Sequence, residues 1–425
     1  MSIRQLNLRK TRSVIIVLSL STLLLSAIPV SAQNVSDRIY SFLELEMKLR
    51  EHPAIEAYAF SAKADRFRAE GAMGLPDPTV SMGLSNFPIL SPSVTEYLPT
   101  HKYIGFSQRL PNKAKRKANS LTSLRRADSR DLQGDMRFAE LRSQLLGLLI
   151  ERDSIDSLRD IMRQRDMKYQ ELYDITEIEM SSGRTSLVRL TEVETRRIDI
   201  QQTLSDLAAQ EADLSAQFID LVGVVPKTER PDILLKPWNG QALSFYSVKV
   251  ADAFVSIQDA AVQKAEVDFK PDLGINFTYQ QRESGQGAPR SNFDGDDWVT
   301  GGVTLTVPIW QDKRQKPLLK GAKLDRSAAQ ALRMATARKA LSDWKRYEAQ
   351  RKSAVSTLDI LNSKVISIER QIASHLNAYE SGSGDYTPIL EGELAILTLQ
   401  EKIIGQKTRR DTATLKMNSL IGDKS

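Results

Sequence analysis

Cysteine is absent from this 425-residue chain, and histidine is rare. Without cysteine there is no disulfide framework, no thiolate zinc site and no cysteine nucleophile. The three histidines, His52, His101 and His375, are far apart and lack the spacing of metal ligands. We therefore predict no metal site and no bound cofactor.

Catalytic and nucleic-acid-binding motifs are missing as well. The sequence contains no P-loop, GxGxxG, HExxH or GxSxG pattern. Acidic residues stand beside Lys and Arg, which is typical of solvated helix faces. No basic patch is interleaved with aromatic residues, as nucleic-acid binding would require. The sequence therefore predicts neither an enzyme nor a nucleic-acid partner.

The single long apolar run lies at the N-terminus. Four basic residues precede an apolar stretch from Val14 to Ile28, and small residues follow at Val30 and Ala32. This pattern predicts a signal peptide over residues 1–32, with an uncleaved anchor as the alternative. A lipoprotein anchor is excluded because no cysteine follows. Removal of the segment lowers the net charge from +6 to +2, so the high pI is largely a property of the signal.

No other apolar run is long enough for a membrane helix, so a membrane crossing would have to use strands. Four segments alternate between apolar and small or polar residues, at about 78–87, 102–110, 272–281 and 298–308. Such segments fit a barrel with lipid on one side and water on the other. A soluble sheet with one buried face is the alternative.

The chain contains an internal repeat. Five residues recur 199 positions later: Gly183, Glu192, Glu194, Leu221 and Gly223 as Gly382, Glu391, Glu393, Leu420 and Gly422. The repeat divides the chain into residues 33–223, a linker or equatorial segment over 224–245, and residues 246–425. Each half is predicted to hold a helix, two strands and a long helical hairpin.

Two uninterrupted helices are predicted over residues 112–181 and 312–381. The first range contains no proline, and Pro317 lies near the start of the second, where a helix tolerates it. About 70 residues would make a rod of roughly 100 Å. Leu141, Leu145 and Leu148 begin a narrow heptad-like stripe on polar helices, as in coiled coils. Such rods suit a structure that spans a distance.

Four strands cannot close a barrel alone, because unpaired edges in hydrocarbon cost several kcal/mol per unsatisfied group. We therefore predict a mixed α/β membrane protein whose copies share one β-barrel, continuous with a barrel of helical hairpins. Three copies would supply twelve strands in a closed ring. Geometry alone also permits two or four copies.

The ordered combination of these features resembles the TolC family of outer-membrane efflux ducts. The resemblance includes the repeat, the prolines beside the strands, the motif Tyr379-Glu380-Ser381-Gly382, and the endings Leu221-Val222-Gly223 and Leu420-Ile421-Gly422. It implies a homotrimer with a twelve-strand barrel in outer-membrane lipid and a helical tunnel across the periplasm. It also implies a passive exit duct that docks to a periplasmic adaptor and an inner-membrane pump.

Two segments resemble the heavy-metal-efflux branch, the CusC and CzcC relatives. They are Leu75 to Leu84 and Tyr103 to Pro111. Those relatives often continue with Pro-Gly-Lys, whereas Asn112-Lys113 follows here. The resemblance of the two segments makes metal cations one candidate cargo, and this departure weakens it. The exported substrate, the pump and the adaptor are not specified by this sequence.

The family closes its periplasmic end with an acidic ring near the turn between the last two long helices, which here is Ser381 to Asp385. The resemblance places Glu391 at a ring position, with Asp385 or Glu393 nearby. Three copies of these carboxylates would attract cations and repel one another; ordinary solvated helix acids are the alternative. The turns with Gly183 and Arg184, and with Gly382 and Gly384, are candidate adaptor-docking tips.

One further function fits the helices, namely a soluble periplasmic coiled-coil scaffold or adaptor. The four amphipathic strands favour the duct instead, and fractionation would separate the two hypotheses.

Overall fold

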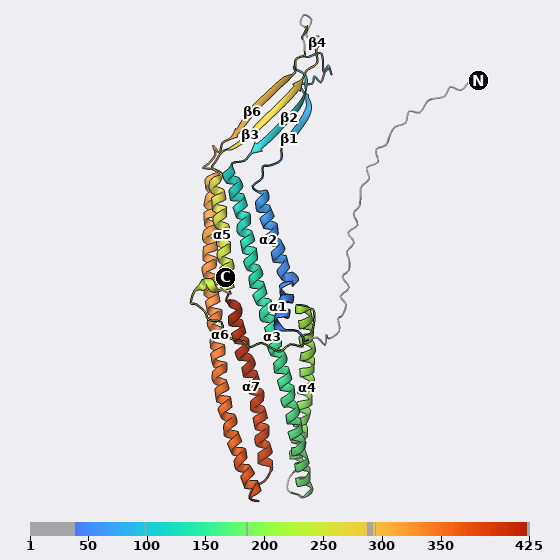
Figure 1. The fold of residues 1–425 in the computed structure, drawn as a ribbon, viewed down its shortest axis with the longest axis vertical. Helices are drawn as coiled ribbons and strands as arrows, with labels where there is room; N and C mark the ends of the chain where they lie inside the picture. Colours follow the sequence, from blue (N-terminus) through green and yellow to red (C-terminus); the bar gives the residue numbers. More distant parts are fainter. Residues whose placement is uncertain (1–38, 98, 184–185, 287–291, 294, 423–425) are drawn as a thin grey trace, which may run out of the picture.

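The computed structural model describes residues 39–422, except 98, 184–185, 287–291 and 294. The predicted signal peptide lies outside these residues. The described chain is elongated, with a sheet at one end and helical hairpins at the other (Figure 1). No helix in the described part of the chain is long and apolar enough to cross a membrane.

Two long helices form the shaft. They are α3 (Lys113–Ser181, 69 residues) and α6 (Gln315–Glu380, 66 residues), each about 100 Å long at 1.5 Å per residue. Asn112 caps α3, because its side-chain oxygen accepts a hydrogen bond of 2.9 Å from the Ala114 amide. Pro317 lies in the first turn of α6, where its missing N–H removes no intrahelical bond. Both helices begin and end within three residues of the predicted positions.

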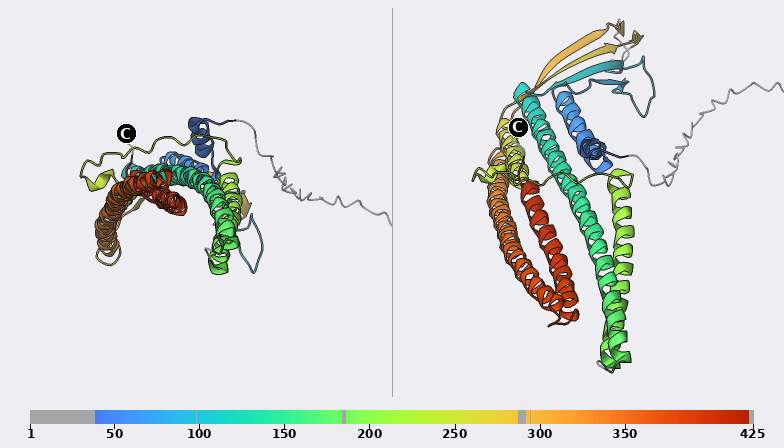
Figure 2. Two further views of the ribbon diagram at one scale, coloured as in Figure 1. Left: turned by 90° about the horizontal axis from the view of Figure 1, so that it is seen from below. Right: turned by 60° about the horizontal axis from the view of Figure 1, so that its bottom comes forward.

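Shorter helices pack along the two rods. α2 (Pro53–Gly71) and α5 (Tyr246–Val267) lie near the sheet, whereas α4 (Leu187–Val222) and α7 (Thr387–Leu420) lie toward the opposite tip. α3 contacts α2, α5, α4 and α7; α6 contacts α5 and α7. Viewed from the tip, the helices form a curved layer that is open on one side (Figure 2).

The sheet has four antiparallel strands in the order β1-β2-β3-β6. They are β1 (Thr79–Ser85), β2 (His101–Leu110), β3 (Asp272–Gln281) and β6 (Trp298–Thr306), within two residues of the predicted bounds. In the register, Val80 lies opposite Phe106, which lies opposite Phe277. The apolar residues of neighbouring strands therefore share one face. A two-residue hairpin, β4 (Gly285–Gln286) with β5 (Asn292–Phe293), lies between β3 and β6.

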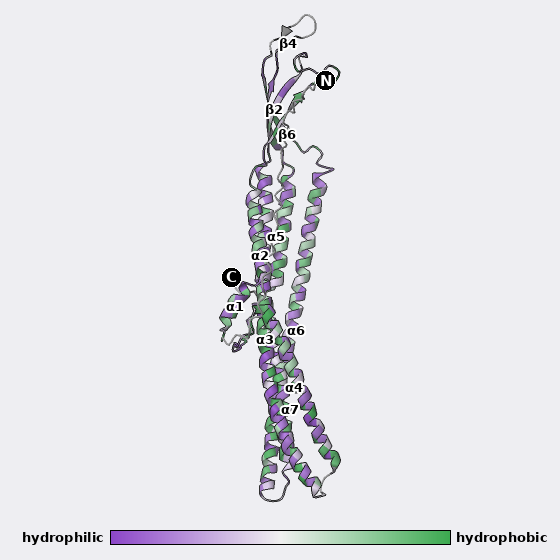
Figure 3. Cartoon of the chain, turned by 90° about the vertical axis from the view of Figure 1, so that its right-hand side faces the viewer, coloured by the Kyte–Doolittle hydropathy of each residue, from purple (hydrophilic) through white to green (hydrophobic). Residues whose placement is uncertain are grey.

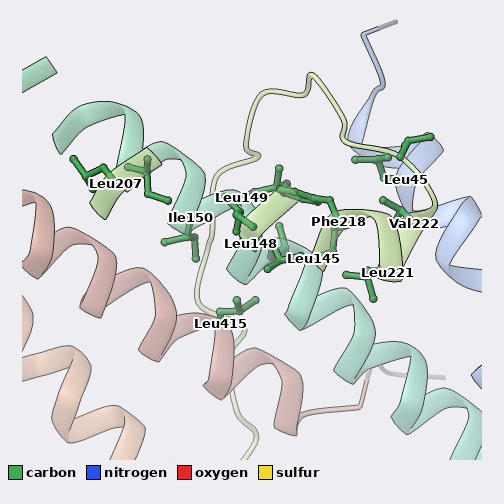
Figure 4. Packing of buried hydrophobic residues seen from close by; sticks show 14 of the residues in the cluster. Leu45, Leu145, Leu148, Leu149, Ile150, Leu207, Phe218, Leu221, Val222 and Leu415 are labelled. Carbon is green, nitrogen blue, oxygen red and sulfur yellow. The ribbon is translucent and has the colours of Figure 1, made fainter. Parts of the chain in front are cut away.

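The main core lies at mid-length, where α1 (Phe42–Arg50) and the end of α4 meet α3. Leu145 and Leu149 of α3 are fully buried and share one cluster with Leu45 and Phe218, as Figure 4 shows. Along the rest of the helices, hydrophilic and hydrophobic residues are interleaved (Figure 3). The narrow stripe on α3 predicted from Leu141, Leu145 and Leu148 is therefore the core of the helical part.

The segment 224–245 wraps across the helices at the same level. Trp238 stacks on Phe245 with ring centroids 5.3 Å apart, and both contact Trp344 of α6. The Phe245–Ile421 bridge joins this segment to the end of α7. Each half of the chain runs helix, two strands of the sheet, long helix, shorter helix; α1 is additional in the first half, and the β4–β5 hairpin is additional in the second. The predicted domain boundaries themselves remain predictions.

Candidate gate at the helical tip

Two tight turns form the end of the molecule that is farthest from the sheet. Gly183 follows α3 with φ 72°, and Gly382 follows α6 with φ 73°. A residue other than glycine is strained in this left-handed conformation. Both turns therefore require the glycines that the sequence places 199 residues apart.

The second turn is a complete glycine C-cap. The Gly382 amide donates to the Tyr379 carbonyl at 2.9 Å, and the Ser383 amide donates to the Ala378 carbonyl at 2.9 Å. This pair of hydrogen bonds is the Schellman arrangement, which satisfies the last carbonyls of a helix. α7 begins five residues after Gly382, so the turn is short and fixed.

Glu391 connects α7 to α4. Its Oε1 lies 2.9 Å from the guanidinium of Arg189, in the first turn of α4. Both side chains are about half exposed, so the pair contributes at most about 1 kcal/mol. It nevertheless joins α4 to α7, which both pack on α3, and Glu391 is the residue predicted for the ring.

Glu393 connects α7 to α3 instead. Its carboxylate lies 2.8 Å from Nζ of Lys168, which also lies 3.2 Å from Glu171. The hydrogen bond from Lys168 to Glu393 raises the pKa of Lys168 above its ordinary value. Tyr386 donates to Glu171 at 3.1 Å. Burial, followed by this hydrogen bond, raises the pKa of Tyr386.

A small apolar cluster supports these polar links. Leu390 is fully buried and packs with Leu394, Leu172 of α3 and Val193 of α4. Beside it lies a groove of about 520 Å³ between α3, α4 and α7. Tyr169, Arg189, Arg196 and Glu391 are among its lining residues. The tip is therefore a packed three-helix unit with charged links on its surface.

The structure separates the three predicted gate acids. Glu391 and Glu393 are two residues apart on a helix and therefore cannot face the same direction. Asp385 is exposed in the turn, and it forms no ion pair within the described chain. Of the docking-turn residues, Gly183, Gly382 and Gly384 lie at the tip, whereas Arg184 is outside the described residues.

Lys168, Glu171, Arg189 and Tyr386 belong to this site but were not predicted from the sequence. Lys168 and Glu393 are 225 positions apart, and no local motif relates them. The sequence gives one weak indication that Arg189 has a partner, because a cation in the first turn of a helix opposes the helix dipole. The ion pair with Glu391 offsets this unfavourable position.

At the other end of the molecule, the apolar face of the sheet is uncovered. Its side chains, from Tyr279 at 39 % to Val303 at 75 %, are exposed on every strand. β1 and β6 are the outer strands, and neither pairs with a further strand in the described structure. In the described residues, no group of three or more His, Asp or Glu side chains is placed to hold a metal ion.

Comparison with known proteins relates this architecture to efflux channels. Residues 246–423 match the model of the outer membrane efflux protein family. The outer membrane protein VceC from Vibrio cholerae superposes with a TM-score of 0.70 at 15% identity, over 89% of this chain and 96% of VceC. CusC superposes with a TM-score of 0.73 at 13% identity, over 93% of this chain and 96% of CusC.

The open state of the MtrE outer membrane channel from Neisseria gonorrhoeae has a TM-score of 0.68 at 13% identity, over 89% of this chain and 88% of MtrE. A search of curated protein sequences finds no significant match. These low identities show a common fold, and the family model covers most of the second half. Together they confirm the resemblance seen in the sequence: residues 246–423 match the outer membrane efflux protein family, and the chain has the fold that VceC and CusC share.

Proposed function

We propose that three copies of this chain form a closed duct, through which substrates delivered by an inner-membrane pump and a periplasmic adaptor leave the cell. The observation that carries the proposal is the sheet, with two unpaired edges and an exposed apolar face. In hydrocarbon, unpaired strand edges cost several kcal/mol per group, so the edges must pair. β1 of one copy and β6 of the next supply that pairing.

The helices favour the same arrangement. Their curved layer is a sector of a wider ring (Figure 2). α6 lies at one side of the sector and exposes a row of apolar side chains that includes Leu324, Leu332 and Ile360. Large exposed apolar patches mark interaction surfaces. A second copy covers this side in the proposed ring.

We place the gate at the tip. The Arg189–Glu391 and Lys168–Glu393 pairs hold α7 against α4 and α3. Opening moves the hairpin of α6 and α7 outward, so both pairs must break and Leu390 of α7 must separate from Leu172 of α3 and Val193 of α4. Asp385, exposed in three copies of the turn, supplies negative charge that attracts cations. The turns at Gly183 and Gly382, with the charged groove beside Arg189, are the proposed adaptor-docking surface.

Cross-linking tests the ring directly. The chain lacks cysteine, so one variant can carry two cysteines, one at Ser81 in β1 and one at Thr304 in β6. We expect a bifunctional thiol reagent to give covalent dimers and trimers in outer-membrane fractions. A control with both cysteines in β2 and β3, at Ser107 and Asn276, should link only within one chain. Intermolecular products from the control alone, or none from the edge pair, would refute the ring.

The cargo is a separate question. CusC and VceC superpose about equally well on this chain, so the fold does not select the heavy-metal branch. Metal cations remain one proposed cargo. Growth of a deletion strain on copper, zinc or drugs, with and without this chain, would identify the class.

A further inference from the structure

The two places where a strand passes into a long helix differ in an informative way. At the first, the backbone N–H of Asn112 donates to the Asp272 carboxylate at 2.9 Å, and Nζ of Lys115 lies 2.7 Å from the same carboxylate. At the second, Ile309 and Trp310 are 70% and 71% exposed. The first junction is tied internally, whereas the second presents a large aromatic side chain to the surroundings.

Basic residues follow Trp310 closely. Residues 311–323 contain five Lys or Arg residues and one acid, Asp312, which pairs with Lys316 at 2.5 Å. Lys313, Arg314 and Lys320 are exposed, and they form no ion pair with any described residue. Cations at the start of a helix oppose the helix dipole, and the first turn of α6 has no acid to balance them. Helix stability therefore does not explain this composition.

The order of chemistry along the chain is that of a membrane surface. Val303, Leu305 and Val307 continue the exposed apolar face of β6, and Ile309 and Trp310 follow. The cations come last, in a turn closed by the Lys313 and Arg314 amides, which donate to the Trp310 carbonyl at 3.2 and 3.1 Å. In membrane proteins, apolar residues face hydrocarbon, Trp lies at the interface, and Lys or Arg meet lipid phosphates.

We propose that residues 307–323 form a lipid-anchoring site for anionic phospholipids at the periplasmic surface of the outer membrane. Trp310 and Ile309 lie at the edge of the hydrocarbon, and Lys313, Arg314 and Lys320 bind headgroup phosphates. The anchor fixes the height of the helical shaft relative to the membrane. The proposal rests on the sheet crossing the membrane, as argued above.

Lipid-quenching fluorescence tests the position of Trp310. The full-length protein is reconstituted in vesicles of dioleoyl-phosphatidylcholine that contain lipids brominated at a known acyl position. Four tryptophans are present, so the difference between the wild type and Trp310→Phe isolates Trp310. We expect stronger quenching by bromine near the headgroup end of the chain than by bromine near its terminus. A Trp310 that is not quenched, in protein that floats with the vesicles, would overturn the anchor.

Lipid preference tests the cations. With brominated phosphatidylglycerol or brominated phosphatidylcholine as guest lipid, the wild type should favour the anionic lipid near Trp310 by about fivefold or more. Lys313→Gln with Arg314→Gln and Lys320→Gln should remove most of this preference. Equal quenching by both lipids in the wild type would contradict the phosphate contacts.

A matched control has the same change in charge elsewhere. Lys364→Gln with Arg370→Gln and Lys402→Gln alters exposed, unpaired cations of the described helices, with Lys364 about 75 Å along α6 from Lys313. We expect this variant to keep the preference for anionic lipid near Trp310. An equal loss of that preference in both triple variants would show that it depends on net charge alone and would contradict a local site. If the wild type and all the variants fail to float with the vesicles, this result would refute membrane insertion by the sheet as well as the anchor.

Discussion

α3 and α6 occupy corresponding places in the two halves of the chain and are almost equally long, yet they are buried very differently. Many apolar side chains of α3, such as Leu145 at 0% exposure, are covered by helices of the same chain. α6 is covered on one side by α5 and α7, and its outer side keeps residues such as Leu332 at 60% exposure. We therefore propose that the two hairpins have different tasks: the first builds the protomer, and the second also offers a surface for a neighbouring copy.

The largest expected effect is on assembly. Leu324→Asp with Leu332→Asp should abolish trimers, because each copy would bury unpaired carboxylates at a cost of several kcal/mol. The protomer should still fold, because both side chains are exposed in the single chain. Size-exclusion chromatography with light scattering, and circular dichroism, measure the two properties. Persistent trimers with normal helix content would mean that α6 is not an interface.

The matching change in α3 should act on folding. Leu145→Ala should lower the free energy of unfolding by about 2–5 kcal/mol, because it leaves a cavity in the main core. Leu332→Ala should lower it by no more than about 0.5 kcal/mol in the separated protomer. Urea unfolding in detergent below the trimer-forming concentration measures both. Equal losses would remove the contrast between the helices.

This contrast was only partly predictable from the sequence. Alternation of apolar and polar residues predicted the four strands within two residues, and the absence of helix breakers predicted both rods. In the sequence, Leu145 and Leu332 cannot be told apart, because both are leucines in long, mostly polar helices. Periodicity shows that a helix has an apolar side but not whether the same chain covers it. The Lys168–Glu393 link was equally unpredictable, because it depends on how α7 packs on α3.

At the tip, the paired charges should control opening. Arg189→Gln or Glu391→Gln should raise the open probability by up to about fivefold, the effect expected from loss of an exposed ion pair. The exchange Arg189→Glu with Glu391→Arg should restore the wild-type value. Single-channel recording of all three variants forms a double-mutant cycle. Additive effects in the cycle would show that the two side chains do not act as a pair.

The glycine turns should matter for docking more than for assembly. Gly382→Val should cost about 1 kcal/mol of local strain, because its φ of 73° is unfavourable for a branched side chain. A Cβ at this position meets no atom within 4 Å in the described structure. We expect trimers to form normally and export to fail, as measured by cross-linking and by accumulation of a known efflux dye. Full export in this variant would move the docking site away from the turn.

The smallest expected effect concerns pH. Because the folded-state pKa of Lys168 is raised, the stability that it contributes is fully present below its unfolded pKa. It is lost only as pH rises through the still higher folded-state pKa. Between pH 6 and 9, Lys168→Gln should therefore change the open probability by the same factor at every pH. A factor that falls within this range would show that Lys168 titrates lower than its contacts imply.

The most direct test of the duct is conductance across a planar bilayer, using protein purified from outer membranes. We expect discrete channels that are mostly closed and select cations. We also expect that Asp385→Asn with Glu391→Gln lowers this selectivity. Trimers that give no channels, or a selectivity that both changes leave untouched, would contradict a gated duct with an acidic tip.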